Sequence, residues 1–414
     1  MSTPNNAHRL KAVAGAAALA GSGLISAAVS SPAQAVPIGP GCPALYVIGI
    51  QGTGQSSPTA DPLADTGVVG ALLGPVQAAA PGLVQHSYIG YQAGFGGAVP
   101  GGGADPYAAS VADERAQLDD AAAEVVRTCP ATLIAGVAYS QGAQAMAGFA
   151  QDVGSGVGPV PPDRIAGIAL YSNPTRPIGG PIFPGRPGQV IPDPAPGTSG
   201  AATSAVQISN AAAGGGGIAD TGTTYGELTG RVADICVDGD LACSAPDKAA
   251  LLRVGAEIAA QASLHDPITA LGSLNALLSA ALGEAWTTVV NHDFQVGAGN
   301  ADYFPQQSLA QRLIDAADPR IPAPSPADAA AAATKWNEIT AAVASNPLGL
   351  LPKLTGQLGN AWGQLMADNA DLGNPGVWLH YADTVARHNG YAATGQLSSG
   401  IAWFVALAHD IGSR

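Results

Sequence analysis

Short apolar runs alternate with helical patterns along much of the chain, and this alternation limits the fold more than any other feature. Strand-like runs rich in Val, Ile and Leu are expected at 45–50, 82–91, 131–139, 164–171, 231–237 and 376–381. Helical patterns follow several of them, at 105–127, 141–152 and 398–409. Strands that alternate with helices form a parallel sheet with helices on both faces. We therefore expect an α/β fold.

Two segments depart from this rhythm. Residues 174–230 are crowded with Gly and Pro and predict a long irregular loop. Residues 247–375 instead carry amphipathic runs at about 247–263, 267–286, 307–316, 326–344 and 352–368. We expect these runs to form a helical cap inserted into the α/β domain, whose two parts would span 36–246 and 376–414.

The first 35 residues have the pattern of a secretory signal peptide. Arg9 and Lys11 give a basic start, an apolar stretch follows, and Ala33-Gln34-Ala35 supplies small residues for cleavage. An N-terminal membrane anchor is the alternative, although Gly21 and Gly23 break the apolar stretch. No later stretch has 18 uninterrupted apolar residues. We expect a secreted protein without a transmembrane anchor.

Composition excludes some partners and suggests disulfides. The net charge is −14, and no basic stripe is present to neutralise phosphates, so a nucleic-acid partner is not expected.

The four cysteines all follow the predicted signal peptide, and an even number in a secreted chain predicts two disulfides with three possible pairings. A zinc site at Cys236 and Cys243 is the alternative, but their spacing is not C-x-x-C and no His lies near them. No metal or cofactor is expected.

Ser140 is the strongest candidate for a nucleophile. It lies between a predicted strand and a predicted helix, with the small residues Ala138 and Gly142 on either side. A sharp strand-to-helix turn needs such neighbours and exposes the serine at the carboxyl end of its strand. The backbone N–H of Gln141, at the start of the helix, would then stabilise an oxyanion.

A nucleophilic serine needs a base, and the base needs an acid that orients it. In the chain order Ser, Asp, His the base follows the acid and lies on a loop at the carboxyl end of the sheet. His86 precedes Ser140, and His265 and His292 fall in the predicted insertion. The two remaining candidates before the last helix are His380 and His388.

The motifs around Ser140 resemble those of the cutinase family of secreted serine esterases, which have the α/β-hydrolase fold. Tyr139-Ser140-Gln141-Gly142 is similar to the family's nucleophile turn, and Gly52-Thr53-Gly54 to its oxyanion loop. The resemblance implies that Thr53 acts with Gln141 in the oxyanion hole. Cys42-Pro43 and Cys129-Pro130 are similar to the family's first cysteine pair, which implies that they form a disulfide.

The resemblance also implies the acid and the base. Residues 236–243 look like the family's disulfide-bracketed acid loop, which implies a Cys236–Cys243 bridge and Asp240 as the acid, with Asp238 as the alternative. His388-Asn-Gly-Tyr391 is similar to the family's His-x-x-Tyr, which favours His388 over His380. The implied triad is Ser140, Asp240 and His388.

The chain departs from compact cutinases in one way that bears on its substrate. Cys243 and His388 are 145 positions apart (388 minus 243), whereas the two motifs nearly adjoin in compact members. A helical insertion at this place is similar to that of mycobacteriophage lysin B. Asn173-Pro-Thr-Arg176-Pro-Ile-Gly-Gly resembles a motif of the mycobacterial PE-PPE serine hydrolases.

Both resemblances imply that the substrates are lipid esters of cell envelopes, including mycolyl esters, in place of the plant-type polyester of compact cutinases. We expect a monomeric carboxylic ester hydrolase. Two alternatives stay open. The first is an acyltransferase that moves a fatty or mycolic acyl group to a sugar, and the second is a non-catalytic, lipid-binding envelope protein.

Overall fold

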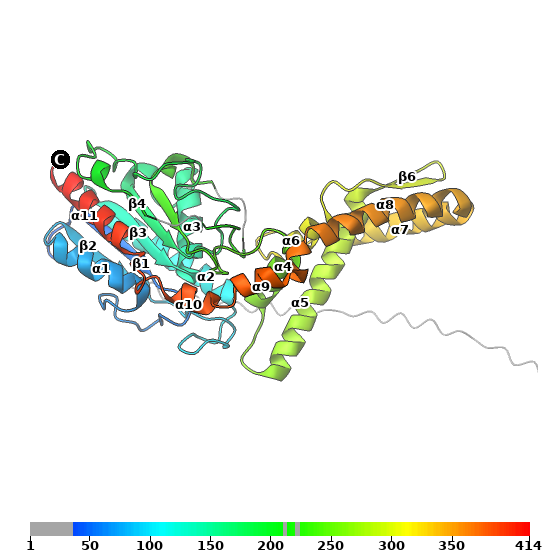
Figure 1. Cartoon of the computed structure of the whole chain (residues 1–414), viewed down its shortest axis with the longest axis horizontal. Coiled ribbons are helices and arrows are strands. Elements are labelled where there is room, and N and C mark those ends of the chain that lie inside the picture. Colours follow the sequence, from blue (N-terminus) through cyan, green and yellow to red (C-terminus); the bar gives the residue numbers. More distant parts are fainter. Residues whose placement is uncertain (1–35, 210–212, 220–223) are drawn as a thin grey trace, which may run out of the picture. The chain divides into compact units, whose positions relative to one another are not determined.

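The computed structural model describes residues 36–209, 213–219 and 224–414 (Figure 1). The predicted signal peptide lies outside the described residues. The core element is a sheet of five parallel strands in the order β2-β1-β3-β4-β5. In chain order the strands are β1 (Leu45–Ile50), β2 (Val84–Tyr88), β3 (Leu133–Tyr139), β4 (Ile165–Tyr171) and β5 (Val232–Ile235).

Helices cover both faces of this sheet, as the sequence predicts. On one face lie α1 (Gly67–Ala79) and α11 (Ser398–Gly412), and on the other lie α2 (Tyr107–Thr128) and α3 (Gln141–Gly154) (Figure 1). Successive side chains of β1 enter the two cores in turn, because side chains alternate across a strand. Leu45 and Val47 pack with α1 and α11, whereas Tyr46 and Ile48 pack with α2 and α3.

The stretch between β4 and β5 is irregular in its described residues, as expected. One buried side chain, Arg176, holds much of it together. Its guanidinium donates to the backbone carbonyls of Gly180, Ala213, Gly215 and Cys243 at 2.8–3.2 Å. Five donors in a rigid fork suit such a multiple contact. Arg176 therefore ties the loop after β4 to the loop after β5.

Five α-helices lie within the region of the proposed cap: α4 (Ala250–Gln261), α5 (Pro267–Thr288), α6 (Leu309–Ala317), α7 (Pro326–Ser345) and α8 (Pro347–Ala367). All five helical runs predicted there are confirmed. Two small apolar clusters stabilise them, one among α4, α5 and α6 and one that includes α7 and α8. An antiparallel hairpin of β6 (Phe294–Gly297) and β7 (Asn300–Tyr303) was not predicted from the sequence.

The strand predicted at 376–381 is wrong. These residues form the short helix α9 (Pro375–His380), followed by α10 (Thr384–Asn389). Pro375 occupies the first turn of α9, where a missing N–H costs nothing, and the Asn374 side chain caps the helix by accepting from the Gly376 N–H. The Asn374 cap and Pro375 favour a helix start here more strongly than the short apolar run at 376–381 favours a strand.

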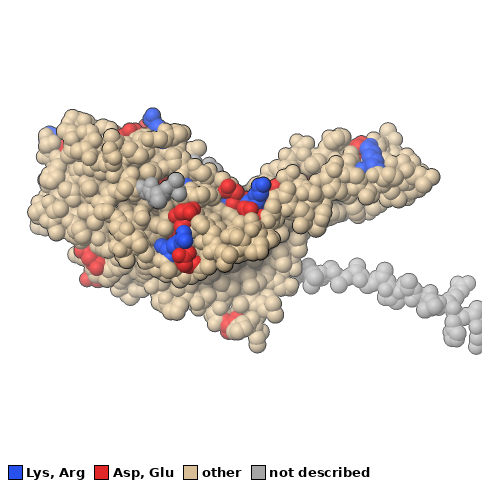
Figure 2. All heavy atoms as spheres, in the orientation of Figure 1, with Lys and Arg blue, Asp and Glu red and all other residues tan. Residues whose placement is uncertain are grey.

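One helix among the described residues, Pro267–Asp293, is long and apolar enough to cross a membrane by length and composition. Only 11% of the most apolar 18-residue stretch of this helix is buried. Charged side chains are sparse on the face drawn in Figure 2, where most of the surface belongs to uncharged residues. This sparseness follows from the composition, since 11% of the residues are charged.

Candidate active site

The carboxyl edge of the sheet collects the candidate site residues. The last residues of three neighbouring strands, Tyr139, Tyr171 and Ile235, are paired across the sheet. The residue that follows each strand therefore lies at the same edge. Ser140 follows β3, Ser172 follows β4, and the cysteine-bracketed loop follows β5. Parallel α/β sheets bind their ligands at this edge.

Ser140 has a backbone conformation that non-glycine residues rarely adopt, with φ of 55° and ψ of −118°. Its N–H donates to the Tyr171 carbonyl at 2.9 Å, and helix α3 begins at the next residue. Gly142 is required by close packing, since a Cβ there would lie 2.6 Å from the Gln51 carbonyl oxygen. This is the geometry of a nucleophile turn, in which strain is stored at the reactive residue.

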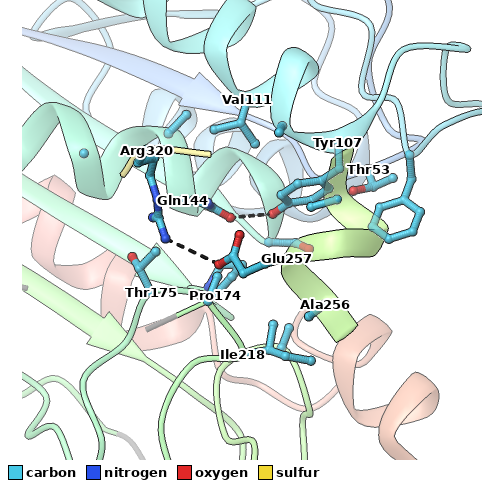
Figure 3. Close-up of a pocket in the computed structure, with 18 of the residues that line it drawn as sticks. Thr53, Tyr107, Val111, Gln144, Pro174, Thr175, Ile218, Ala256, Glu257 and Arg320 are labelled. Atoms are coloured by element: carbon cyan, nitrogen blue, oxygen red, sulfur yellow. Dashed lines mark hydrogen bonds and ion pairs between the residues drawn. The ribbon is translucent and has the colours of Figure 1, made fainter. Parts of the chain in front are cut away.

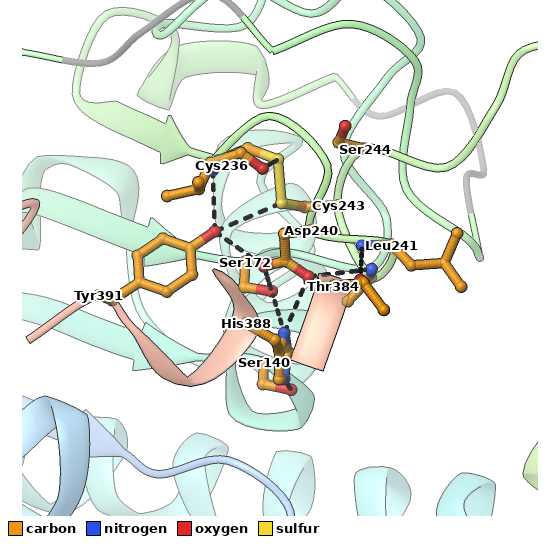
Figure 4. Close-up of polar contacts among 12 residues, drawn as sticks. Ser140, Ser172, Cys236, Asp240, Leu241, Cys243, Ser244, Thr384, His388 and Tyr391 are labelled. Atoms are coloured by element: carbon orange, nitrogen blue, oxygen red, sulfur yellow. Dashed lines mark hydrogen bonds and ion pairs between the residues drawn. A yellow bond between two sulfur atoms is a disulfide. The ribbon is translucent and has the colours of Figure 1, made fainter. Parts of the chain in front are cut away.

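Ser140, His388 and Asp240, three residues far apart in sequence, form one chain of hydrogen bonds (Figure 4). The Ser140 Oγ lies 2.9 Å from His388 Nε2, and His388 Nδ1 lies 2.9 Å from Asp240 Oδ1. Asp240 is fully buried, whereas the His388 side chain is 26% exposed. The structure thus brings the three predicted triad residues together.

Asp240 accepts hydrogen bonds on both of its oxygens. Oδ1 accepts from His388 and from the Ala242 N–H, and Oδ2 accepts from the hydroxyls of Ser172 and Tyr391 at 2.6 and 2.9 Å. Burial by itself would raise the pKa of Asp240. The hydrogen bonds and the charge of His388 outweigh burial, and the pKa is lowered. Asp240 is therefore an ionised acceptor near neutral pH.

Two tyrosines hold the segment that carries His388. The Tyr139 hydroxyl donates to the His388 carbonyl at 2.6 Å, and the Tyr391 hydroxyl accepts from the Val237 N–H at 3.0 Å. Tyr391 belongs to the His-x-x-Tyr pattern in the sequence, but no role was predicted for it, and Ser172 was not predicted at all. A serine directly after a strand is too common a signal to single out, because its contacts depend on the register of three strands.

The rival candidates His380 and Asp238 pair with each other instead. Their Nε2 and Oδ2 atoms are 3.3 Å apart, and both side chains are about two-fifths exposed. Asp238 also accepts from the Gly214 N–H through Oδ1. His388 and not His380 is the histidine within hydrogen-bond distance of Ser140.

The two expected oxyanion residues face each other across the turn. The Thr53 Oγ1 lies 3.3 Å from the Gln141 Oε1. Gln141 is the first residue of α3, so its backbone N–H has no acceptor within the helix. The Gln141 side chain donates to the Gly94 and Tyr107 carbonyls at 3.1 and 3.3 Å, which fixes the start of the helix.

The expected cysteine pairs are both present, as Cys42–Cys129 and Cys236–Cys243. The zinc alternative is wrong, because Cys236 and Cys243 are bonded to each other. Among the described residues there is no group of three or more His, Cys, Asp or Glu side chains that could hold a metal ion.

A cavity of about 1370 Å³ opens onto Ser140 and His388. Figure 3 shows part of its lining, including Thr53, Val111 and Ile218. Its floor comes from α2 and α3, and its other walls include α4, α6 and residues 318–321 of the proposed cap. Many lining side chains are apolar, namely Phe95, Val99, Val111, Ile218, Leu241, Ile314 and Ile321. Such a lining suits a ligand with a substantial apolar part.

One wall of the cavity is polar. The Tyr107 hydroxyl donates to Gln144 at 2.8 Å, and Arg320 lies 3.4 Å from Glu257 (Figure 3). Arg320 also lies 2.7 Å from Asp318. Burial raises the pKa of Glu257 to about 7, with the nearby Asp318 adding to the rise and Arg320 opposing it. The cavity therefore combines an apolar lining with one cluster of charged groups.

The sequence model of the Cutinase family matches residues 41–253, just over half of the chain. A comparison with curated proteins gives no match.

Several solved structures are similar at low identity. The catalytic core domain of acetyl xylan esterase from Trichoderma reesei is 18% identical over 57% of this chain and 99% of its own, with a TM-score of 0.34. Lysin B from Mycobacteriophage D29 is 21% identical over 54% and 75%, with a TM-score of 0.34. A cutinase-like protein from Cryptococcus sp. is 17% identical over 49% and 80%, with a TM-score of 0.31.

Proposed function

The chain belongs to the cutinase family of carboxylic ester hydrolases, and we propose that it is a secreted serine esterase that cleaves lipid esters through an acyl-enzyme on Ser140. The observation that carries this proposal is the hydrogen-bonded series Ser140–His388–Asp240, whose two contacts are both 2.9 Å. It ends at a strained serine that faces a large cavity.

The first step is attack by the Ser140 hydroxyl on the ester carbonyl. His388 Nε2 accepts the Ser140 proton as the Oγ–C bond forms, and the resulting imidazolium is stabilised by ionised Asp240. The carbonyl oxygen becomes an oxyanion. We assign its stabilisation to the backbone N–H groups of Gln141 and Thr53, and to the Thr53 hydroxyl, which would turn its proton from the Gln141 Oε1 to the oxyanion.

The second step releases the alcohol and then the acid. His388 gives its proton to the leaving alcohol as the tetrahedral intermediate collapses to the acyl-enzyme. Water then attacks the acyl carbon as His388 accepts a proton from it. The second tetrahedral intermediate collapses when the Ser140 Oγ–C bond breaks and His388 returns the proton to the Ser140 Oγ, which frees the acid. Mutation series on such triads give losses of about 10³- to 10⁶-fold in kcat, because the three groups act as a unit.

The lipid part of the proposal rests on the cavity. Its volume of about 1370 Å³ exceeds the usual 300–1,000 Å³ of small-ligand sites. The apolar side chains around Ser140 would accommodate a long acyl chain, and the insertion supplies part of the wall. Envelope lipids, including mycolyl esters, are the substrates that we propose.

Hydrolysis of p-nitrophenyl esters from acetyl to palmitoyl tests this function, with purified mycolyl esters assayed alongside. We expect the wild-type enzyme to prefer long acyl chains and Ser140→Ala to lose activity by at least about 10³-fold. Substantial activity in Ser140→Ala would contradict the assignment of Ser140 as the nucleophile. A short-chain optimum would instead contradict the lipid substrate, and a new acyl ester in the presence of trehalose or glycerol would indicate an acyltransferase.

A further inference from the structure

Ser172 is a buried hydroxyl that the two-step mechanism does not use. It is the first residue after β4, is fully buried, and donates its N–H to the Ile235 carbonyl at 3.0 Å. Its side chain contacts two triad members at once. The Oγ lies 2.6 Å from Asp240 Oδ2 and 2.9 Å from His388 Nδ1 (Figure 4).

We propose that Ser172 is a positioning residue that sets the tautomer and orientation of His388 from the side opposite Ser140. This inference rests on the proposed function, since it assigns a role within the same site. Ser172 acts through His388 and Asp240 and does not itself contact the substrate.

The direction of the hydrogen bonds follows from the number of protons available. An ionised carboxylate only accepts, so the single proton of the Ser172 hydroxyl is directed to Asp240 Oδ2. The Oγ can then only accept from His388, which requires a proton on Nδ1. With Nδ1 protonated, the lone pair of the neutral imidazole is on Nε2, where it faces the Ser140 hydroxyl.

The Nδ1–H therefore has two acceptors, Asp240 Oδ1 and Ser172 Oγ, each 2.9 Å away. Two acceptors on different elements restrict rotation of the ring more than one does. The loop after β5 supplies Asp240, and the end of β4 supplies Ser172. A base held in this way keeps its Nε2 aimed at Ser140, which is the requirement for fast proton transfer.

The backbone of Ser172 also has an unusual conformation. Its φ is 54°, in the left-handed region that glycine occupies without strain and other residues rarely adopt. A strained residue within a functional site suggests that its side chain has a role there. Here the side chain is the hydroxyl that joins His388 and Asp240.

Two substitutions at this position separate the hydroxyl from the backbone. Ser172→Ala removes the hydroxyl and keeps the strain, whereas Ser172→Gly removes the hydroxyl and relieves the strain. Ala298→Gly is the matched control, because Ala298 has a φ of 49° in the turn between β6 and β7 and lies outside the site. The readouts are kcat and KM on p-nitrophenyl butyrate, the rate of Ser140 labelling by a fluorophosphonate, and the Tm.

We expect both Ser172 variants to lose kcat by about tenfold, the size of one hydrogen bond, while KM stays within about twofold. The labelling rate falls by the same factor, because labelling also needs His388 as base. Ser172→Gly has the higher Tm of the two, and Ala298→Gly keeps wild-type kcat.

A wild-type kcat in Ser172→Gly, or a loss of kcat confined to the less stable Ser172→Ala, would overturn the inference. Each result would mean that Ser172 matters only for the fold. A wild-type enzyme that neither hydrolyses esters nor reacts with the fluorophosphonate would overturn the proposed function itself. The two failures are therefore distinguishable.

Discussion

Two histidine–aspartate pairs lie near the carboxyl end of β5, and they differ in what else they contact. His388 and Asp240 are joined at 2.9 Å, and His388 reaches Ser140. His380 and Asp238 are joined at 3.3 Å with both side chains about two-fifths exposed. The exposed His380–Asp238 pair contributes little to the free energy of unfolding, because water screens the attraction between its charges.

The residue-scale prediction compares the two pairs. We expect His388→Ala to lower kcat by about 10³-fold or more, because Ser140 loses its base. His380→Ala, the matched control, should retain kcat within about twofold. Initial rates on p-nitrophenyl butyrate measure both, and a larger loss in His380→Ala than in His388→Ala would reverse the assignment.

Among single residues, those that lie in a short catalytic motif could be predicted from the sequence. Ser140, Asp240 and His388 each lie in a recognisable local pattern, and the structure brings them together. Ser172 has no such pattern. Its contacts arise because Tyr139, Tyr171 and Ile235 end their strands in register, and that register is not visible in the residues themselves.

At the scale of elements, the two disulfides differ in the length of chain that they close. Cys42–Cys129 spans 87 positions and joins the start of β1 to the end of α2, whereas Cys236–Cys243 spans seven and brackets Asp240. A crosslink stabilises mainly by restricting the unfolded chain, and more so for longer loops. The first bridge therefore bears mainly on stability and the second on the position of Asp240.

Replacing each cysteine pair by serines tests this division. Loss of Cys42–Cys129 should reduce the free energy of unfolding by about 4 kcal/mol and leave kcat of the folded enzyme near wild type. Loss of Cys236–Cys243 should cost about 2 kcal/mol but lower kcat by at least about tenfold. Urea titrations and initial rates measure the two effects, and the opposite pattern would contradict this division of roles.

The contact of α4 with residues 318–320 predicts a dependence of stability on pH. Burial raises the pKa of Glu257 to about 7, against about 4.3 in an unfolded chain. Between these values the folded protein binds more protons than the unfolded one, so this group's contribution to stability falls as the pH rises. The total loss is at most about 4 kcal/mol.

Glu257→Gln removes this group's titration. We expect the Tm of Glu257→Gln minus that of the wild type to increase between pH 4.5 and 7.5. Glu338→Gln, on an exposed position of α7, controls for the loss of one negative charge. A difference that stays constant or decreases over this range would contradict the placement of Glu257.

Some helices and strands could be predicted from the sequence and others could not, because the local signals differ in strength. The five helices α4 to α8 have long periodic patterns, which are the strongest local signal. The run at 376–381 was too short to distinguish a strand from a helix, and the capping by Asn374 and Pro375 decided it. The β6–β7 hairpin was missed although Gly297-Ala298-Gly299 is a typical turn sequence.

At the scale of the whole molecule, the cavity at the site is lined both by helices that pack on the sheet and by residues of the proposed cap. The α2 and α3 helices supply the floor of the cavity, and α4 supplies Ala256, Glu257 and Ala260 to its wall. The sequence predicted an insertion and a catalytic edge separately. It could not predict that they share a cavity, because that depends on contacts between segments far apart in the chain.

A bulky residue on α4 tests this shared cavity. Ala256→Phe should lower kcat/KM on palmitoyl esters by about tenfold and leave acetyl esters within about twofold, because only the long chain needs the space beyond Ser140. Ala331→Phe, at an exposed position of α7, is the matched control. Equal losses on both esters would contradict a role for α4 in holding the acyl chain.

The central claim is that Ser140 is a nucleophile activated by His388. Its most direct measurement is mass spectrometry of the protein after reaction with a fluorophosphonate, followed by peptide mapping. We predict a single adduct on Ser140, formed much more slowly in His388→Ala and absent in Ser140→Ala. An unreactive wild-type protein, or an adduct on any other residue, would contradict the claim.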